Sequence, residues 1–319
     1  MDPKLVSASV LIRALYFSCI ALVPLQFKEE AHYFYILCYI ASTVGSIVGF
    51  LLVRHLGRWI YWSASILTLA SIPLLPESVE IIAFATGLVN PLLVPLAIEE
   101  REVTYTYSAF SIGIGLSALT ISKTGVEVLG ILYSLSLFLL RPPTVTENRI
   151  LPRALDKDIL LLAFSNFSTS AVFSLVILFG FSRISEVAVP VFYFIIAISR
   201  LFFELELKVS MALITLLSPL LFVLPKPINL FVLIAVGVAY AQAHPRIAEL
   251  VGRKENRLFS ANAVFSGEFG GNVIFPLISS YSLYLALGLA EAALIGSAYL
   301  NFRFSLEGRG GKPTIRRNS

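Results

Sequence analysis

Apolar runs long enough to cross a lipid bilayer recur along almost the whole chain, and only short polar segments separate them. A bilayer core about 30 Å thick requires about 20 apolar residues when they form a helix. Only helices and closed barrels satisfy every backbone polar group inside a membrane, and runs of this length are typical of helices. The sequence therefore predicts an all-α membrane protein with no room for a soluble catalytic domain.

The composition agrees with this prediction and indicates which kinds of partner the protein has. Hydrophobic residues make up 57% of the 319 residues and charged residues 14%, whereas about 25% of the residues of soluble domains are charged. The net charge of +4 would suit a nucleic acid only if the basic residues gathered on one solvated face. They are scattered through short segments, so we expect the lipid bilayer and no nucleic acid as a partner.

The residues that bind metals in other proteins form no recognisable pattern here. Cys19 and Cys38 lie inside apolar runs, and the three histidines are far apart in the sequence. No pair of cysteines has the spacing of a metal or redox motif. We therefore expect no metal and no cofactor.

Twelve runs between charged residues, prolines or glycines predict the membrane spans. Lys123 and Gly125 barely separate the fifth run from the sixth, so one long bent helix is an alternative there. The predicted spans are 5–27, 32–53, 59–76, 79–98, 107–122, 124–140, 158–182, 187–203, 208–225, 228–243, 258–279 and 281–302.

The basic residues orient these spans, because lysine and arginine concentrate in cytoplasmic loops. With both termini cytoplasmic, nineteen of the 24 basic residues fall inside, four fall in outer loops, and Arg13 lies within a span. The longest polar segment, residues 141–157, is expected to be a cytoplasmic linker between six-helix bundles at 1–140 and 158–302. The tail 303–319 has few apolar residues and is expected to be cytoplasmic and disordered.

The segment between the second and third spans, GFLLVRHLGRW, carries a family resemblance through Gly49, Arg54, Gly57 and Arg58. Together with the two groups of six helices and the basic linker, it resembles the major facilitator superfamily (MFS). That family's signature here is glycine, three residues, aspartate, arginine, any residue, glycine and a basic pair; this chain has one residue more and no aspartate. The resemblance implies a gating role for these four residues. It also implies a central pathway lined by the first, fourth, seventh and tenth spans.

Two charged residues lie deep within predicted spans. Ionisable side chains cost about 2.5 to 3.5 kcal/mol at the centre of a membrane helix and are functional candidates by default. Arg13 in the first span could bind an anionic substrate, or its long side chain could extend to the membrane surface. Glu268 in the eleventh span lies at a similar depth and is a candidate proton site, although the glycines beside it also fit a packing role.

Uncharged polar side chains in the spans complete the predicted pathway. Any one of them could instead only hold two helices together. With Arg13 and Glu268, the predicted substrate and ion pathway contains Tyr16, Asn90, Asn166, Ser170, Tyr240 and Gln242.

These features favour a secondary transporter in the cell membrane that carries a small molecule by alternating access, as a monomer, with protons as the candidate coupling ion. No phosphate-binding loop of the Walker A type is present. A ten-span drug/metabolite-type carrier is one alternative. An integral-membrane enzyme for lipid-linked substrates is another, because such enzymes need clustered carboxylates and the segment 99–102 reads EERE.

Overall fold

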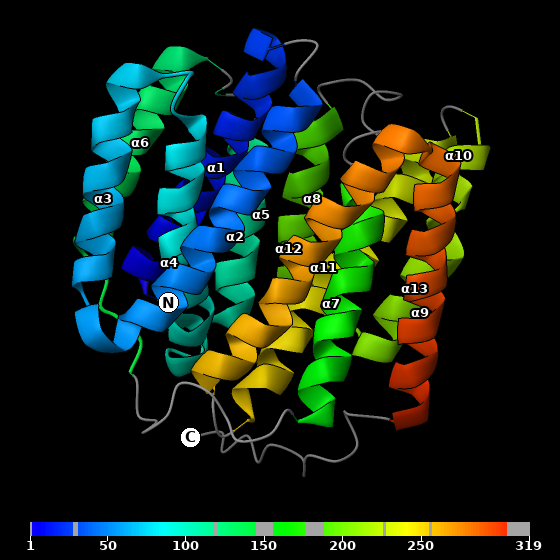
Figure 1. Cartoon of the computed structure of the whole chain (residues 1–319). Coiled ribbons are helices and arrows are strands. Elements are labelled where there is room, and N and C mark those ends of the chain that lie inside the picture. The colour runs from blue at the N-terminus through cyan, green and yellow to red at the C-terminus, as the bar shows by residue number, and fades with distance from the viewer. Residues whose placement is uncertain are drawn as a thin grey trace.

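The computed structural model describes residues 2–27, 31–117, 120, 122–144, 156–175, 188–225, 228–254 and 257–304. Within these ranges the chain is helical and contains no strand. The helices lie side by side along one common direction (Figure 1). In chain order they are α1 (Pro3–Phe27), α2 (Ala31–Leu56), α3 (Trp59–Ser71) with the 3₁₀ turn Ile72–Leu74, α4 (Val79–Glu99), α5 (Val103–Ser117), α6 (Lys123–Leu137), α7 (Lys157–Leu175), α8 (Ala188–Phe202), α9 (Leu207–Leu217), α10 (Leu220–Val223), α11 (Ile228–Gly252), α12 (Arg257–Tyr281) and α13 (Leu283–Phe304).

The surface of these helices suits lipid. Five described helices, α2, α4, α7, α11 and α13, are long and apolar enough to cross a membrane, and α3, α6, α8 and α9 with α10 are shorter apolar helices. Large apolar side chains such as Ile47, Ile66 and Phe202 are exposed on them. A water-soluble protein rarely exposes apolar patches this extensive, so the outer faces are those of a multi-pass membrane protein.

The structure corrects several predicted boundaries. Helices α5 and α6 are separate, which excludes the single bent helix. The predicted span 208–225 is broken between α9 and α10, where Pro219 precedes α10. The predicted end of the tenth span at residue 243 is wrong, because α11 continues through Pro245 to Gly252. Residues 176–182, 145–155 and 305–319, which fall in a predicted span, the linker and the tail, lie outside the described residues.

Two prolines inside helices leave carbonyl groups without their usual donor, because proline has no backbone N–H to offer the residue four positions earlier. Pro91 lies four residues after Gly87, and the Gly87 carbonyl accepts a hydrogen bond from the Ser46 hydroxyl of α2 at 3.2 Å. Pro245 lies four residues after Ala241, and the Ala241 carbonyl accepts one from Nε of Arg200 at 2.8 Å. Side chains of neighbouring helices thus supply the hydrogen bonds that these two carbonyl groups lack within their own helices.

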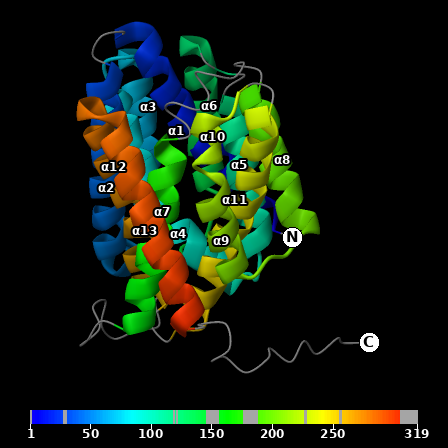
Figure 2. The ribbon, with the colours of Figure 1, turned by 90° about the vertical axis from the view of Figure 1, so that its right-hand side faces the viewer.

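Glycines allow two helix pairs to approach closely. A Cβ atom at Gly45 or Gly49 of α2 would meet backbone atoms of α4, and one at Gly267 or Gly271 of α12 would meet backbone atoms of α7. Such small residues drive close helix packing in membranes. The result is that α2 packs chiefly on α4 and α12 chiefly on α7. Figure 2 shows the second pair, α7 and α12, from the side.

The buried apolar side chains form two clusters. The first draws almost all its members from α1 to α6, and the second draws all of its buried members from α7 to α13. Helices α5 and α8 pack against each other between the two groups, as do α2 and α12. The region between the two clusters is where most of the charged side chains discussed below are found.

Several loops meet at one end of the helices, here called the linker end. It contains the turn around Arg58, the segments 99–102 and 138–144, and the contact of Lys254 with Asp156 and Asp158. The Arg58 guanidinium donates to the Phe138 carbonyl at 2.9 Å. Lys254 contacts Asp156 at 2.6 Å and Asp158 at 2.7 Å. The hydrogen bond from Lys254 lowers the pKa of Asp156, so this contact persists at neutral pH and weakens only in acid, as the pH falls through that lowered pKa.

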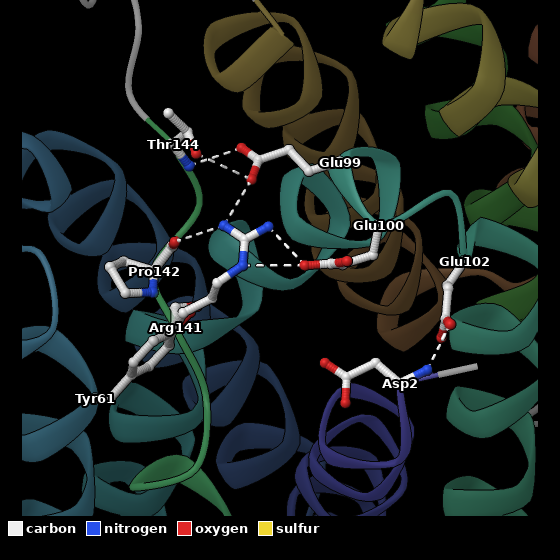
Figure 3. Close-up of polar contacts among 8 residues, drawn as sticks. All are labelled: Asp2, Tyr61, Glu99, Glu100, Glu102, Arg141, Pro142 and Thr144. Atoms are coloured by element: carbon white, nitrogen blue, oxygen red, sulfur yellow. Dashed lines mark hydrogen bonds and ion pairs between the residues drawn. The ribbon is translucent and has the colours of Figure 1, made fainter.

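The acidic segment 99–102 is also held at the linker end (Figure 3). Arg141 forms ion pairs with Glu99 at 3.0 Å and Glu100 at 2.6 Å, and Glu99 accepts a hydrogen bond from the Thr144 backbone N–H at 2.7 Å. Glu102 accepts one from the Asp2 backbone N–H. These carboxylates attach the start of the linker and the N-terminus to the end of α4.

Candidate functional site

Arg13 and Glu268 lie at the centre of the candidate site. Nη2 of Arg13, on α1, is 4.0 Å from Oε1 of Glu268, on α12, and both side chains are mostly buried. The Arg13 guanidinium also lies 4.7 Å from the ring centroid of Phe110 on α5. Arg13 therefore points into the protein and does not extend to the membrane surface. Its Nε is buried and has no hydrogen-bond partner among the residues that the structure describes.

Glycine places both charged side chains. Gly113 of α5 faces Val10 and the Cβ of Arg13, so α1 and α5 approach closely at this level. Gly267 and Gly271 face α7, while Glu268 between them lines the cavity on the other side of α12. The glycines beside Glu268 thus account for helix packing, and the carboxylate is left to face Arg13.

Arg200 is a third charged residue of the site, and the sequence interpretation missed it. The charge count assigned Arg200 to the cytoplasmic side, although the predicted span 187–203 contains it; it lies in the last turn of α8 with 6% of its surface exposed. Its guanidinium donates to the Ala241 carbonyl of α11 and to the Tyr107 carbonyl and Ser111 hydroxyl of α5. The sequence signal was available in Pro245, because that proline leaves the Ala241 carbonyl without a helical donor.

Aromatic side chains surround these charges. The ring of Tyr240 stacks on Phe173 with centroids 3.9 Å apart and meets His244 edge-on at 4.5 Å. Tyr107 lies near His244 from α5, at 6.3 Å. Both ring nitrogens of His244 and the Tyr107 hydroxyl are buried without a partner in the described structure. The site therefore offers several polar atoms that a ligand could satisfy.

Two cavities share a wall formed by Arg13, Tyr107 and Glu268. The central cavity has a volume of about 50 Å³ and is also lined by Arg200, Tyr240 and His244. The side cavity has a volume of about 300 Å³ and lies between α2, α4 and α12. Arg13, Tyr107 and Glu268 thus face both cavities, at the place where the two halves of the chain meet.

The structure distributes the other predicted pathway residues between this site and helix contacts. Asn90 lines the side cavity. Asn166 donates to the Val264 carbonyl at 3.1 Å, Gln242 donates to the Ser199 carbonyl at 3.1 Å, and Ser170 lies against Gly271. Tyr16 is buried beside Tyr39, with ring centroids 5.7 Å apart. These last four therefore contact neighbouring side chains or helices and do not line either cavity.

The residues of the predicted gating loop do not form one group. Gly49 lies inside α2 against Leu88 of α4. Arg54 is in the last turn of α2, and Arg58 precedes α3. Gly57 lies in the turn between them with φ +50°, a conformation that costs glycine little. Gly49 therefore serves the helix contact, and only the other three lie at the linker end.

The described residues contain no group of three or more His, Cys, Asp or Glu side chains that could hold a metal ion. In the EERE segment, Glu99 and Glu100 are paired with Arg141. The chemistry that the described site offers is therefore that of charged and hydrogen-bonding side chains in an apolar surrounding.

Solved structures with the same arrangement are membrane transporters. A bacterial homologue of the iron transporter ferroportin, in an outward-facing state, matches with a TM-score of 0.63 and 16% identity over 95% of this chain and 98% of that chain. The E. coli fucose:proton symporter FucP matches with a TM-score of 0.60 and 12% identity over 94% and 98%. An auto-inhibited peptide transporter of the POT family matches with a TM-score of 0.61 and 10% identity over 99% and 98%.

No protein-family model and no curated protein sequence matches the chain. At these identities the solved structures establish the fold alone. The chain shares the all-helical fold of these three solved structures.

Proposed function

We propose that the protein is a secondary transporter of the MFS type, which moves a small molecule across the cell membrane by alternating access. In this proposal, residues 1–140 and 158–302 form two bundles of six spans, and the linker end and both termini face the cytoplasm. The MFS-like fold and the separate apolar clusters of the two halves support it.

The contact between Arg13 and Glu268 is the observation that carries this proposal. Arg13 belongs to the N-terminal half and Glu268 to the C-terminal half, and they face each other across a cavity. Rocking of the halves changes the distance between these two side chains. The charges therefore respond to the same motion that exposes a central site to one side of the membrane and then to the other.

The linker end has contacts that such a motion would have to open. The rings of Phe50 on α2 and Phe259 on α12 lie 6.4 Å apart. Gly252, at the end of α11, lies against Ile98 near the end of α4. Both contacts join the two halves, so their separation would open the site toward the linker end.

The proposed coupling ion is the proton, and the surroundings of Glu268 support this part of the proposal. Burial among apolar side chains favours the neutral carboxyl group, and a neighbouring guanidinium favours the carboxylate. Because the two influences oppose each other, a movement of Arg13 changes which form is preferred. Glu268 can then take up a proton in one state of the transporter and release it in the other.

The test is a substrate screen in proteoliposomes with and without a pH gradient. Wild type is compared with Glu268→Gln, which keeps the size of the side chain, and with Arg13→Ala. We expect Glu268→Gln to abolish gradient-driven accumulation and to retain counterflow exchange. We expect Arg13→Ala to weaken binding of an acidic substrate about tenfold, equivalent to about 1.4 kcal/mol. Wild-type behaviour of both variants would exclude this site.

The alternatives receive less support. The fold comparisons favour an MFS-like arrangement over a ten-span carrier. For a membrane enzyme, the carboxylates of the EERE segment would have to face a substrate. Glu99 and Glu100 face Arg141 and Thr144, and this contact accounts for them as parts of the linker end.

A further inference from the structure

The side cavity extends from the charged centre to the outer surface of the protein. Arg13 and Glu268 line its inner end. Ile47 and Leu51 of α2, which are 53% and 45% exposed, line it at the other end, together with the exposed Ser266 of α12. The surface at this point carries the apolar side chains expected to face lipid. The cavity thus lies between the hydrocarbon of the bilayer and the Arg13–Glu268 contact.

Helices α2 and α12 meet along a seam, and each of them packs less closely on the other than on its partner in its own half. Gly45 and Gly49 hold α2 against α4, and Gly267 and Gly271 hold α12 against α7. Between α2 and α12 the described ring contact is the one between Phe50 and Phe259. Helices joined by close backbone packing on one side and by large side chains on the other can separate on the second side without losing the first contact. Figure 1 shows α2 and α12 next to each other along this seam.

The lining changes in character along the cavity. Its wall is mainly apolar and contains Phe50, Val94, Phe259 and Phe265. Most of the polar side chains along the wall have partners within the helices: Ser46 donates to the Gly87 carbonyl, Asn262 to the Leu258 carbonyl and Ser266 to the Ala263 carbonyl. Asn90 of α4 adds one further polar side chain to the wall. Among the described residues that line this cavity, the buried side-chain atoms without a hydrogen-bond partner are Nε of Arg13 and the hydroxyl of Tyr107, at the inner end. A ligand that fits has one polar end and a long apolar part.

The charged side chains at the inner end of the cavity determine which charge the polar end of the ligand carries. Two guanidinium groups and one carboxylate line the two neighbouring cavities: Arg13 and Glu268 face both, and Arg200 faces the central one. A buried excess of one positive charge is costly unless a negative group compensates it. Nε of Arg13 has no acceptor within the described part of the chain, and a carboxylate or another acidic group is the acceptor that a guanidinium binds best.

We propose that the transported substrate is an amphipathic monoanion that enters from the bilayer through the α2–α12 seam. Its acidic head binds Arg13 at the inner end, and its hydrocarbon tail occupies the side cavity. The cavity of about 300 Å³ is at the lower end of the range of about 300 to 1,000 Å³ for small-molecule sites, so a single chain fits and a two-chain lipid does not. This inference rests on the proposed function and names the substrate class for it.

The experiment uses the full-length protein in phosphatidylcholine nanodiscs and a long-chain fatty acid that carries a photoactivatable diazirine in its tail. The labelled positions are located by mass spectrometry of peptides. A matched alcohol with the same tail and no charge reports labelling by ordinary lipid contact. We expect the acid to label the segments around Ile47 and Ser266 about tenfold more than the alcohol does, a preference equivalent to about 1.4 kcal/mol. Exposed positions away from the cavity, Ile66 and Ile274, are expected to show no such preference.

Competitors and variants test the two ends of the ligand separately. Unlabelled dodecanoate should reduce the labelling, whereas butyrate and dodecylamine should not. Arg13→Gln should remove the preference for the acid over the alcohol. Ile47→Trp should block labelling of the segment around Ser266 by the acid, and Val44→Trp, one turn away on the same exposed stripe, should leave it unchanged.

Two outcomes would overturn the inference, and neither depends on transport. Equal labelling by acid and alcohol would exclude an anion site, and competition by butyrate as strong as that by dodecanoate would exclude the tail site. Gradient-driven uptake of a hydrophilic substrate, together with equal labelling, would leave the proposed function standing without this substrate class. Selective labelling with no transport of any acid under any gradient would instead contradict the proposed function and leave the binding site.

Discussion

Arg200 shows how one backbone defect determines the position of a buried charge. Pro245 cannot donate to the Ala241 carbonyl, and Nε of Arg200 takes that place at 2.8 Å. The remaining donors of the guanidinium reach the Tyr107 carbonyl and the Ser111 hydroxyl on α5. The fork of five N–H groups permits these bonds in several directions, which the single ammonium group of lysine cannot reproduce. Arg200 thus joins α8 and α11 to a helix of the other half.

We predict that Arg200→Lys lowers the free energy of unfolding in detergent by about 2 to 3 kcal/mol, because hydrogen bonds to a charged group contribute about 1.5 to 3 kcal/mol each. Pro245→Ala restores an N–H for the Ala241 carbonyl. The decrease in the free energy of unfolding caused by Arg200→Lys should therefore be about 1 kcal/mol smaller in the Pro245→Ala background. Arg253→Lys, at an exposed position, is the control and should change nothing. Additive effects of the two substitutions would contradict this account of the Ala241 carbonyl.

At the scale of the elements, the glycines of α2 and α12 divide each helix into a fixed side and a weaker side. Gly49 faces the Leu88 carbonyl of α4, and Gly271 faces backbone atoms of α7 at Phe167 and Ala171. An added methyl group at either position meets backbone, which cannot rotate out of the way as a flexible side chain does. The two helices would have to move apart from their partners within their own halves.

Gly49→Ala and Gly271→Ala are therefore expected to lower the free energy of unfolding by about 1 to 3 kcal/mol each, as overpacking does in tightly packed interiors. Gly288→Ala is the matched control in α13, because nothing lies within 4 Å of its added Cβ. It should leave stability unchanged or raise it by up to about 1 kcal/mol through helix propensity. Thermal unfolding in detergent measures all three. A loss for Gly288→Ala as large as for Gly271→Ala would contradict a role specific to the helix contacts.

The elements also show what the sequence could and could not reveal. Apolar runs and flanking charges predicted most of the helices within a few residues, because the bilayer imposes a length on each of them. The continuation of α11 through Pro245 depends on Arg200 of another helix, which no local pattern contains. The interruption of the predicted span 208–225 coincides with Pro219, a local signal that an apolar run alone does not reveal. Gly49 matched a loop signature in the sequence, but its role in the structure comes from the backbone of α4.

At the scale of the whole molecule, the sequence predicts that Arg13 and Glu268 lie at a similar depth in their spans. The fold brings Nη2 of Arg13 and Oε1 of Glu268 to a distance of 4.0 Å. Depth is readable from sequence because each helix crosses the same hydrocarbon. The direction in which a side chain points around its helix is less readable, since buried and lipid-facing sides are both apolar. This is why Tyr16 and Ser170 were expected in the pathway and pack among helices, while the side cavity between α2 and α12 was not foreseen.

The sidedness of the whole molecule is the remaining consequence of the proposal, and two exposed positions test it. Glu77 lies in the turn that joins the 3₁₀ turn Ile72–Leu74 to α4. Arg253 lies just after α11, at the linker end. Lysine and arginine gather on the cytoplasmic side of membrane proteins. We therefore expect Arg253→Cys to be protected from a membrane-impermeant maleimide in intact cells and to react after permeabilisation, whereas Glu77→Cys reacts in both conditions.

The native Cys19 and Cys38 are buried, so the wild-type protein should remain unlabelled in both conditions and serves as the background. A variant in which both cysteines are alanine controls for reagent that enters the cavity. Labelling of both introduced cysteines in intact cells would mean that the two positions share a side, and an alternating path of the chain through the membrane would then be wrong. Labelling of Arg253→Cys alone would keep the alternation and reverse the orientation, which would place Lys254, Arg141 and the linker end outside the cell.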